Sequence, residues 1–92
     1  MRENKLQAEC IKDAKKIGAW AIKVKAIGRR GFPDLLVIFP GGQVIFVEMK
    51  IKGGRLSPSQ RIVIRMLRKF GVPTYVCDNQ PEFNEILRRH IR

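Results

Sequence analysis

Two carboxylates and one lysine stand where a small folded protein usually places apolar side chains. Asp34 follows Pro33 and opens the apolar run DLLVIF, and Glu48 and Lys50 lie near the end of a second apolar run, QVIFVEMK. Residues two apart in a β-strand share a face, so Glu48 and Lys50 are expected to point the same way. Two acids beside a lysine suit metal-assisted cleavage of a phosphodiester.

The two apolar runs are joined by Pro40, Gly41 and Gly42, which predicts a β-hairpin. If these three residues form the loop, continuing the ladder places Asp34 opposite Glu48. Their Cβ atoms would then be about 5 Å apart, and at an effective dielectric of about 20 the carboxylates would repel by roughly 3 kcal/mol. A divalent cation held by both would offset this repulsion, and hard oxygen ligands favour Mg²⁺ or Mn²⁺ over zinc.

A purely structural alternative stays open for these residues. Asp34 could end a loop, while Glu48 and Lys50 form an ordinary salt bridge. An isolated Glu-x-Lys pair is common. The prediction of phosphodiester cleavage therefore depends on the whole set of residues occurring together in a basic chain.

The chain is strongly basic, with 19 Lys and Arg against 8 Asp and Glu, a net charge of +11 and a pI near 10.5. This surplus indicates a polyanionic partner, with nucleic acid first and an anionic membrane surface second. The membrane is disfavoured because no run approaches the roughly 20 apolar residues that span a bilayer. The start, MRENKLQAEC, has no apolar signal core, so we expect a cytoplasmic protein in which Cys10 and Cys77 stay reduced.

The elements that must position the site can be followed along the chain. Residues 2–16 lack Gly and Pro and show helical spacing of apolar residues, which predicts a helix closed by Gly18. The stretch AWAIKVKAI alternates, so we expect a strand with Trp20, Ile22 and Val24 inward and Lys23 and Lys25 in water.

After the hairpin, Ser57 and Pro58 predict the start of a second helix. Its apolar side is expected to consist of Ile62, Met66 and Phe70, widened by Val63 and Leu67. PTYVCD predicts a fourth strand, and residues 81–91 a closing helix. The expected fold is therefore one α/β domain over residues 1–92, of order α-β-β-β-α-β-α, with a central sheet flanked by helices.

The segment GFPDLLVIFPGGQVIFVEMK resembles the Pro-Asp and Glu-x-Lys core of the restriction-endonuclease-like, or PD-(D/E)xK, nucleases. With GRLSPSQ after it and a glutamate-containing helix before it, the chain is similar to a stand-alone VRR-NUC domain of the phage type. The resemblance implies a restriction-endonuclease-like core with a mixed sheet, divalent metal, and DNA cleavage. It also implies a homodimer that acts on branched DNA such as Holliday junctions.

Catalytic roles follow for several residues. Asp34 and Glu48 are the expected metal ligands, and the resemblance adds the main-chain carbonyl of Met49. Lys50 is expected to orient the attacking water or to stabilise charge on the phosphate. Two helical residues are also implied, Glu3 of the first helix and Gln60 of the second.

These two helical assignments are less constrained by the sequence. Glu3 is followed one turn later by Gln7, on the side of the helix expected to face the protein, and Glu9 is the fallback. Glu3 could instead be a solvated terminus. Gln60 could be an ordinary surface residue.

Cations flank the expected site in two glycine-containing loops, which suits contacts to phosphates. The candidate DNA-binding residues are Arg29, Arg30, Lys52, Arg55 and Lys23, with Lys25 beside them. A basic tail of Arg88, Arg89, His90 and Arg92 is expected to be solvated.

Two other functions remain open, a non-catalytic nucleic-acid-binding module and a nuclease subunit that acts only with a helicase. For the homodimer, the candidate contact surface comprises Trp20, Phe83, Ile86 and Leu87. Those residues could equally complete the core of a monomer.

Overall fold

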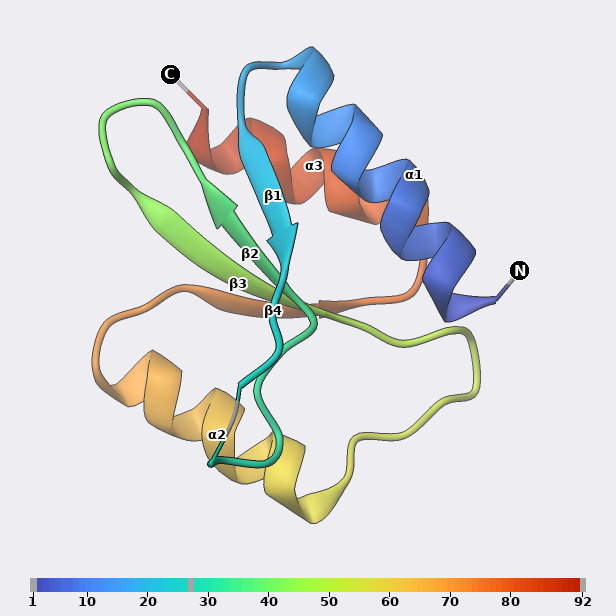
Figure 1. Cartoon of the computed structure of the whole chain (residues 1–92), viewed down its shortest axis with the longest axis vertical. Coiled ribbons are helices and arrows are strands. Elements are labelled where there is room, and N and C mark those ends of the chain that lie inside the picture. The colour runs from blue at the N-terminus through green and yellow to red at the C-terminus, as the bar shows by residue number, and fades with distance from the viewer. Residues whose placement is uncertain (1, 27, 92) are drawn as a thin grey trace.

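A computed structural model describes residues 2–26 and 28–91. Figure 1 shows the helices and strands in chain order: α1 (Glu3–Lys16), β1 (Trp20–Lys23), β2 (Leu35–Ile38), β3 (Val44–Met49), α2 (Pro58–Lys69), β4 (Thr74–Cys77) and α3 (Gln80–His90). The predicted α/β class and element order are confirmed. None of the helices in the described part of the chain has the length and apolar character needed to cross a membrane.

The strands form one mixed sheet in the order β1-β2-β3-β4, in which β4 is parallel to β3 and the other pairs are antiparallel. The hairpin turns as predicted through residues 40–42, since the Phe39 amide donates to the Gln43 carbonyl at 2.8 Å. Leu35 pairs with Val47, so the same register extended by one residue places Asp34 opposite Glu48.

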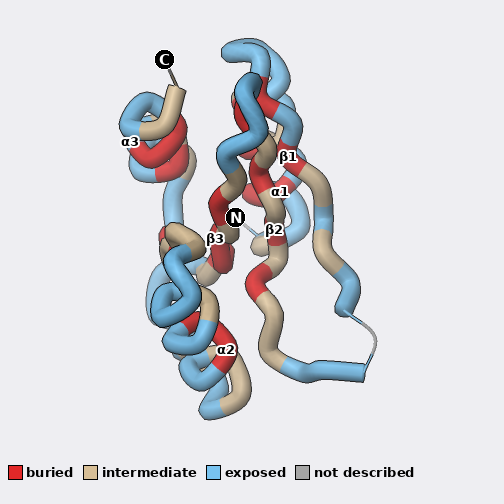
Figure 2. Tube along the Cα trace, turned by 90° about the vertical axis from the view of Figure 1, so that its left-hand side faces the viewer, coloured by how far each residue is buried: buried red, intermediate tan, exposed pale blue. Residues whose placement is uncertain are grey.

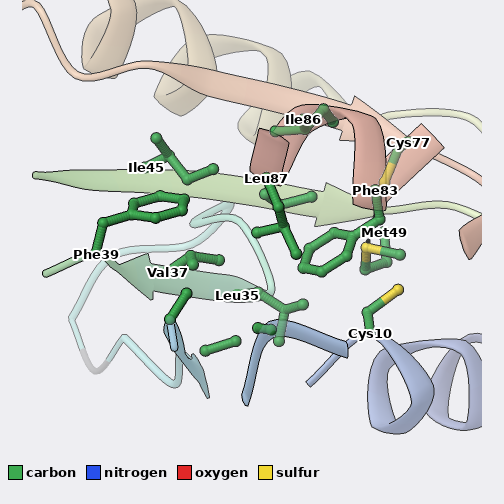
Figure 3. Packing of buried hydrophobic residues seen from close by; sticks show 14 of the residues in the cluster. Cys10, Leu35, Val37, Phe39, Ile45, Met49, Cys77, Phe83, Ile86 and Leu87 are labelled. Atoms are coloured by element: carbon green, nitrogen blue, oxygen red, sulfur yellow. Dashed lines mark hydrogen bonds between the residues drawn. The ribbon is translucent and has the colours of Figure 1, made fainter. Parts of the chain in front are cut away.

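One face of the sheet holds the hydrophobic core. Helices α1 and α3 lie side by side over this face (Figure 1). Figure 3 shows side chains of α3 packed over Leu35 and Met49, with Cys10 of α1 beside them. Phe83, Ile86 and Leu87 are fully buried here. The expectation that they form a contact surface is therefore wrong, because they complete the core of the monomer.

The other face of the sheet is only partly covered. Helix α2 packs at its β4 side, where the Arg68 guanidinium donates to the Thr74 carbonyl at 3.0 and 2.8 Å. The uncovered part carries half-buried or exposed apolar side chains of the first three strands, namely Trp20, Ile22, Leu36, Ile38, Val44 and Phe46.

The predicted orientation of β1 is wrong. Ala19 and Ala21 face the core, whereas Trp20 is 63% exposed on the opposite face. Helix α1 packs directly against β1, and the small alanine side chains leave room for this approach.

The apolar side of α2 was predicted correctly only in part. Val63 is buried and Leu67 is half-buried, as expected, but Ile64 is the other buried residue of this helix, and Ile62, Met66 and Phe70 are exposed. In Figure 2, much of α2 is coloured as exposed. Residues 28–30 in the loop before β2 are also exposed. The helix start was correct, because Ser57 and Gln60 form a reciprocal capping box.

Candidate active site

Asp34 and Glu48 meet at the end of the β2–β3 hairpin that lies away from its turn. Asp34 immediately precedes β2, and Glu48 is the second-last residue of β3. The Met49 amide donates a hydrogen bond to Asp34 Oδ2 at 3.2 Å, which orients the Asp34 carboxylate toward β3. Asp34 is half-buried, whereas the Glu48 side chain is only 1% exposed.

Glu48 has different surroundings at its two carboxylate oxygens. Glu48 Oε2 accepts a hydrogen bond from Gln60 Nε2 at 3.2 Å and lies 3.7 Å from Lys50 Nζ. Glu48 Oε1 is buried and has no hydrogen-bond partner among the described residues. A buried oxygen without a partner is costly, so this position favours a ligand that can satisfy it.

The electrostatics of this pair favour a bound cation. Burial, followed by the nearby charge of Asp34, raises the pKa of Glu48 from 4.5 to about 7, although Lys50 opposes the shift. Two neighbouring carboxylates repel each other when both are ionised, and a cation would relieve that repulsion. Lys50 lies on one side of Glu48 and leaves Oε1 unpaired.

The donor set fits Mg²⁺ or Mn²⁺. Asp34 and Glu48 would hold such an ion through carboxylate oxygens, the ligands that hard cations prefer. Within residues 2–26 and 28–91, no three Asp, Glu, His or Cys side chains gather into a possible metal site. Mg²⁺ usually retains several waters and binds substrate phosphates, so two protein carboxylates are compatible with it.

The structure brings Gln60 to the carboxylates but leaves Glu3 apart from them. Glu3 opens α1 and is half-buried, and it forms no metal-ligand cluster with Asp34 and Glu48 in the described chain. Gln7 is buried, as expected for its side of α1. Glu9, the fallback for Glu3, is half-buried.

The candidate phosphate-binding cations are divided between two regions. Four of them are exposed in the loops that precede Asp34 and follow Lys50, namely Arg29, Arg30, Lys52 and Arg55. Lys23 differs, because it pairs with Leu35 and so belongs to the face covered by α1 and α3. Lys23 is therefore on the opposite face of the sheet from the carboxylates, and Lys25 is exposed beyond the end of β1.

The basic tail makes local contacts on α3. Arg88 pairs with Glu85 at 2.8 Å, and the Arg89 guanidinium lies 6.0 Å from the Tyr75 ring centroid. His90 Nε2 and the Tyr75 hydroxyl are 2.6 Å apart. Arg92 lies outside the described residues. The described part of the tail thus contacts neighbouring residues of α3 and β4, away from the carboxylate pair.

Gly31 is a functional candidate that sequence reasoning missed. Its φ is +92°, and an added Cβ would lie 2.5 Å from the carbonyl carbon and oxygen of Ser59. The backbone before Asp34 therefore lies directly on the first turn of α2, which also carries Gln60. The available signal was a glycine three residues before the aspartate, but its contact with α2 is a tertiary feature.

Comparisons with known proteins agree with this fold. The sequence profile of the VRR-NUC domain matches residues 2–81. "Putative nuclease p44" of Acyrthosiphon pisum secondary endosymbiont phage 1 is 38% identical over 80 residues, covering 87% of this chain and 86% of that protein. A solved structure titled "VRR_NUC domain" superposes with a TM-score of 0.85 at 28% identity, covering 96% of each chain. The profile match and the similar phage protein show that this chain belongs to the VRR-NUC domain family.

Proposed function

We propose that this chain is an endonuclease that hydrolyses phosphodiester bonds in DNA and depends on Mg²⁺ or Mn²⁺. The observation that carries the proposal is the buried Glu48, whose Oε1 has no partner in the described chain and which stands beside Asp34. The net charge of +11 favours a polyanionic substrate. Membership of the VRR-NUC family and a relative named as a nuclease support the same activity.

The residues around the pair have separable roles. A divalent cation held by Asp34 and Glu48, with the Met49 carbonyl as a further candidate ligand, would polarise the phosphate and favour ionisation of water. Hydrogen bonds from the Met49 amide and Gln60 keep the two carboxylates oriented. Lys50 carries a compact charge that can orient the attacking water or stabilise charge developing on the phosphate.

A cleavage assay tests the catalytic proposal. Labelled duplex, single-stranded and four-way-junction DNA would be incubated with the protein in Mg²⁺, in Mn²⁺ and in EDTA. We expect cleavage with either metal, none in EDTA, and none by Asp34→Asn. Glu85→Gln is the matched control, because it neutralises an exposed carboxylate of α3 away from the site.

Two other outcomes would replace the proposal. Tight DNA binding without cleavage under every metal condition would favour a non-catalytic binding module. Cleavage that begins only when a helicase is added would favour a subunit of a larger enzyme. Undiminished cleavage by Asp34→Asn would refute the assignment of the site.

We further propose that the enzyme is a homodimer that acts on branched DNA such as a Holliday junction, since paired cuts require two sites related by a two-fold axis. With three of the four predicted contact residues buried in the core, the remaining candidate is an apolar row across the uncovered sheet face. This row, the Trp20 patch, consists of Trp20, Ile38 and Val44, which pair across β1, β2 and β3. It lies at the end of the sheet away from Asp34 and Glu48.

Light scattering at micromolar concentration tests the assembly. We expect about twice the monomer mass for the wild type and the monomer mass for Trp20→Ser. Since Trp20 is 63% exposed, its replacement should leave the fold intact, which circular dichroism would check. A monomeric wild type at concentrations where junction cleavage is maximal would refute the dimer.

A further inference from the structure

An apolar groove is lined by residues that lie close in sequence to Asp34 and to Gln60. It has a volume of about 260 Å³ and lies between the loop before β2 and the helix α2. Its lining consists of Arg29, Phe32, Val63, Met66, Leu67 and Phe70. Phe70 is 75% exposed, so a large aromatic face is left in solvent at the edge of a highly charged molecule. Exposed apolar patches rimmed by polar residues often mark interaction sites or ligand-binding grooves.

The groove is close to the proposed catalytic residues along both of its walls. Phe32 meets the ring of Phe46 edge-on, with centroids 6.0 Å apart. Phe46 precedes Glu48 by two residues on the same face of β3, roughly 7 Å along the strand. On the other wall, Val63 follows Gln60 within one helical turn, and Gln60 donates to Glu48. A DNA strand with a phosphate at the carboxylates would therefore bring a neighbouring nucleotide to the groove.

Charge indicates what occupies the groove. Helix α2 carries Arg and Lys side chains but no Asp or Glu, and Arg29 belongs to the groove lining itself. A second copy of the chain placed here would bring the same cations face to face. A nucleotide has the complementary character, because a flat base suits the aromatic walls and its phosphate suits the surrounding cations.

We propose that this groove binds a nucleobase that is unstacked at the branch point of the substrate DNA. The base would stack on Phe32 and Phe70, and Arg29 would contact the adjacent phosphate. This inference rests on the proposed function as a DNA nuclease and deepens it, because it gives the enzyme a preference for DNA that exposes a base. Stacking of one base on aromatic side chains corresponds to roughly 5- to 100-fold in affinity.

The test compares two exposed apolar residues of the same helix. Phe70→Ala removes a groove wall, whereas Ile62→Ala removes a side chain that is 49% exposed and does not line the groove. Binding would be measured in Ca²⁺, to prevent cleavage, with 2-aminopurine placed at the branch point of a junction and within an uninterrupted duplex. Phe70→Ala is expected to weaken junction binding by roughly 5- to 100-fold and to remove the fluorescence quenching caused by stacking. Duplex binding should stay within about twofold, and Ile62→Ala should change neither measurement.

Several results would overturn this assignment. Equal losses on junction and duplex, or no loss on either, would show that Phe70 does not recognise an unstacked base. A change from dimer to monomer in Phe70→Ala would show that the groove is a contact between copies of the chain. The binding measurement does not need catalysis. A protein that cleaves no DNA but shows Phe70-dependent quenching would therefore refute only the proposed nuclease activity. Normal cleavage without that quenching would refute only the proposal that the groove binds a base.

Discussion

Replacing Gly31 by alanine tests whether the loop that carries Arg29 and Arg30 must lie directly on α2. An added Cβ would lie 2.5 Å from the Ser59 carbonyl atoms and 2.8 Å from the Gln60 nitrogen. These are backbone atoms of a helix start held by the Ser57 and Gln60 capping box. They cannot rotate aside like a side chain, so the loop and the helix must separate by roughly 1 Å to restore normal contact.

Gly28 provides a matched control at the other end of the same pair of arginines. Its φ is +94°, close to the +92° of Gly31, but an added Cβ would meet no atom of the described chain within 4 Å. Left-handed backbone costs a residue with a Cβ about 1 to 2 kcal/mol, and overpacking costs about 1 to 3 kcal/mol more. We therefore expect Gly28→Ala to lose about 1 to 2 kcal/mol of stability and Gly31→Ala about 2 to 5 kcal/mol.

The two variants should differ more in their rate of DNA cleavage than in their stability. Separation of the loop from α2 draws Gln60 away from Glu48, to which it now donates at 3.2 Å. A misplacement of about 1 Å at a reacting centre can cost about 100-fold in rate. Single-turnover DNA cleavage with saturating metal, at a temperature where both variants are folded, should be about 100-fold slower for Gly31→Ala and within a few-fold of wild type for Gly28→Ala. Equal rates for the two variants would refute the positioning role of this contact.

Three further predictions concern the charged groups. Lys50→Ala should abolish cleavage while Mn²⁺ binding by calorimetry stays unchanged, because the ammonium is not a ligand; near-wild-type cutting would remove Lys50 from the mechanism. Because the folded pKa of Glu48 is raised to about 7, Glu48→Gln should stabilise the metal-free protein by up to about 3 kcal/mol at pH 8. That gain should fade as pH falls below 7 and wild-type Glu48 becomes protonated; equal gains at pH 5 and pH 8 in EDTA denaturation curves would contradict the shift. DNA binding in Ca²⁺ should fall with salt at a log–log slope of about −0.9 per phosphate contacted, and a constant that barely changes between about 50 and 200 mM salt would contradict a phosphate track.

Several features of the fold could be predicted because their determinants are local. Pro40, Gly41 and Gly42 define a three-residue turn, and the turn length alone sets the register that places Asp34 opposite Glu48. Ser57 and Pro58 similarly mark the first turn of α2 without any tertiary information.

Other features depended on contacts between distant parts of the chain. Alternation in β1 identifies two faces but not which one meets α1, and here the small face of Ala19 and Ala21 is buried. The position of Glu3 relative to the carboxylates also depends on how α1 docks. The contact of Gly31 with Ser59 joins the loop before β2 to the first turn of α2, which is far away in sequence, so no local pattern predicts it.

The apolar residues of β1 and α2 that were expected to be buried but are exposed lie on the same side of the molecule as the carboxylate pair. Trp20 and Ile22 belong to the sheet face that carries Phe46 and Glu48, and Phe70 stands over that face on α2. Natural sequences agree with their folds at most positions, so disagreements concentrate at functional sites. The hydrophobic core forms on the sheet face that α1 and α3 cover. The opposite face is therefore left free for binding. The exposure of Trp20 and Phe70 on this side agrees with the two proposals made above, that Trp20 lies in a contact between subunits and that Phe70 contacts DNA.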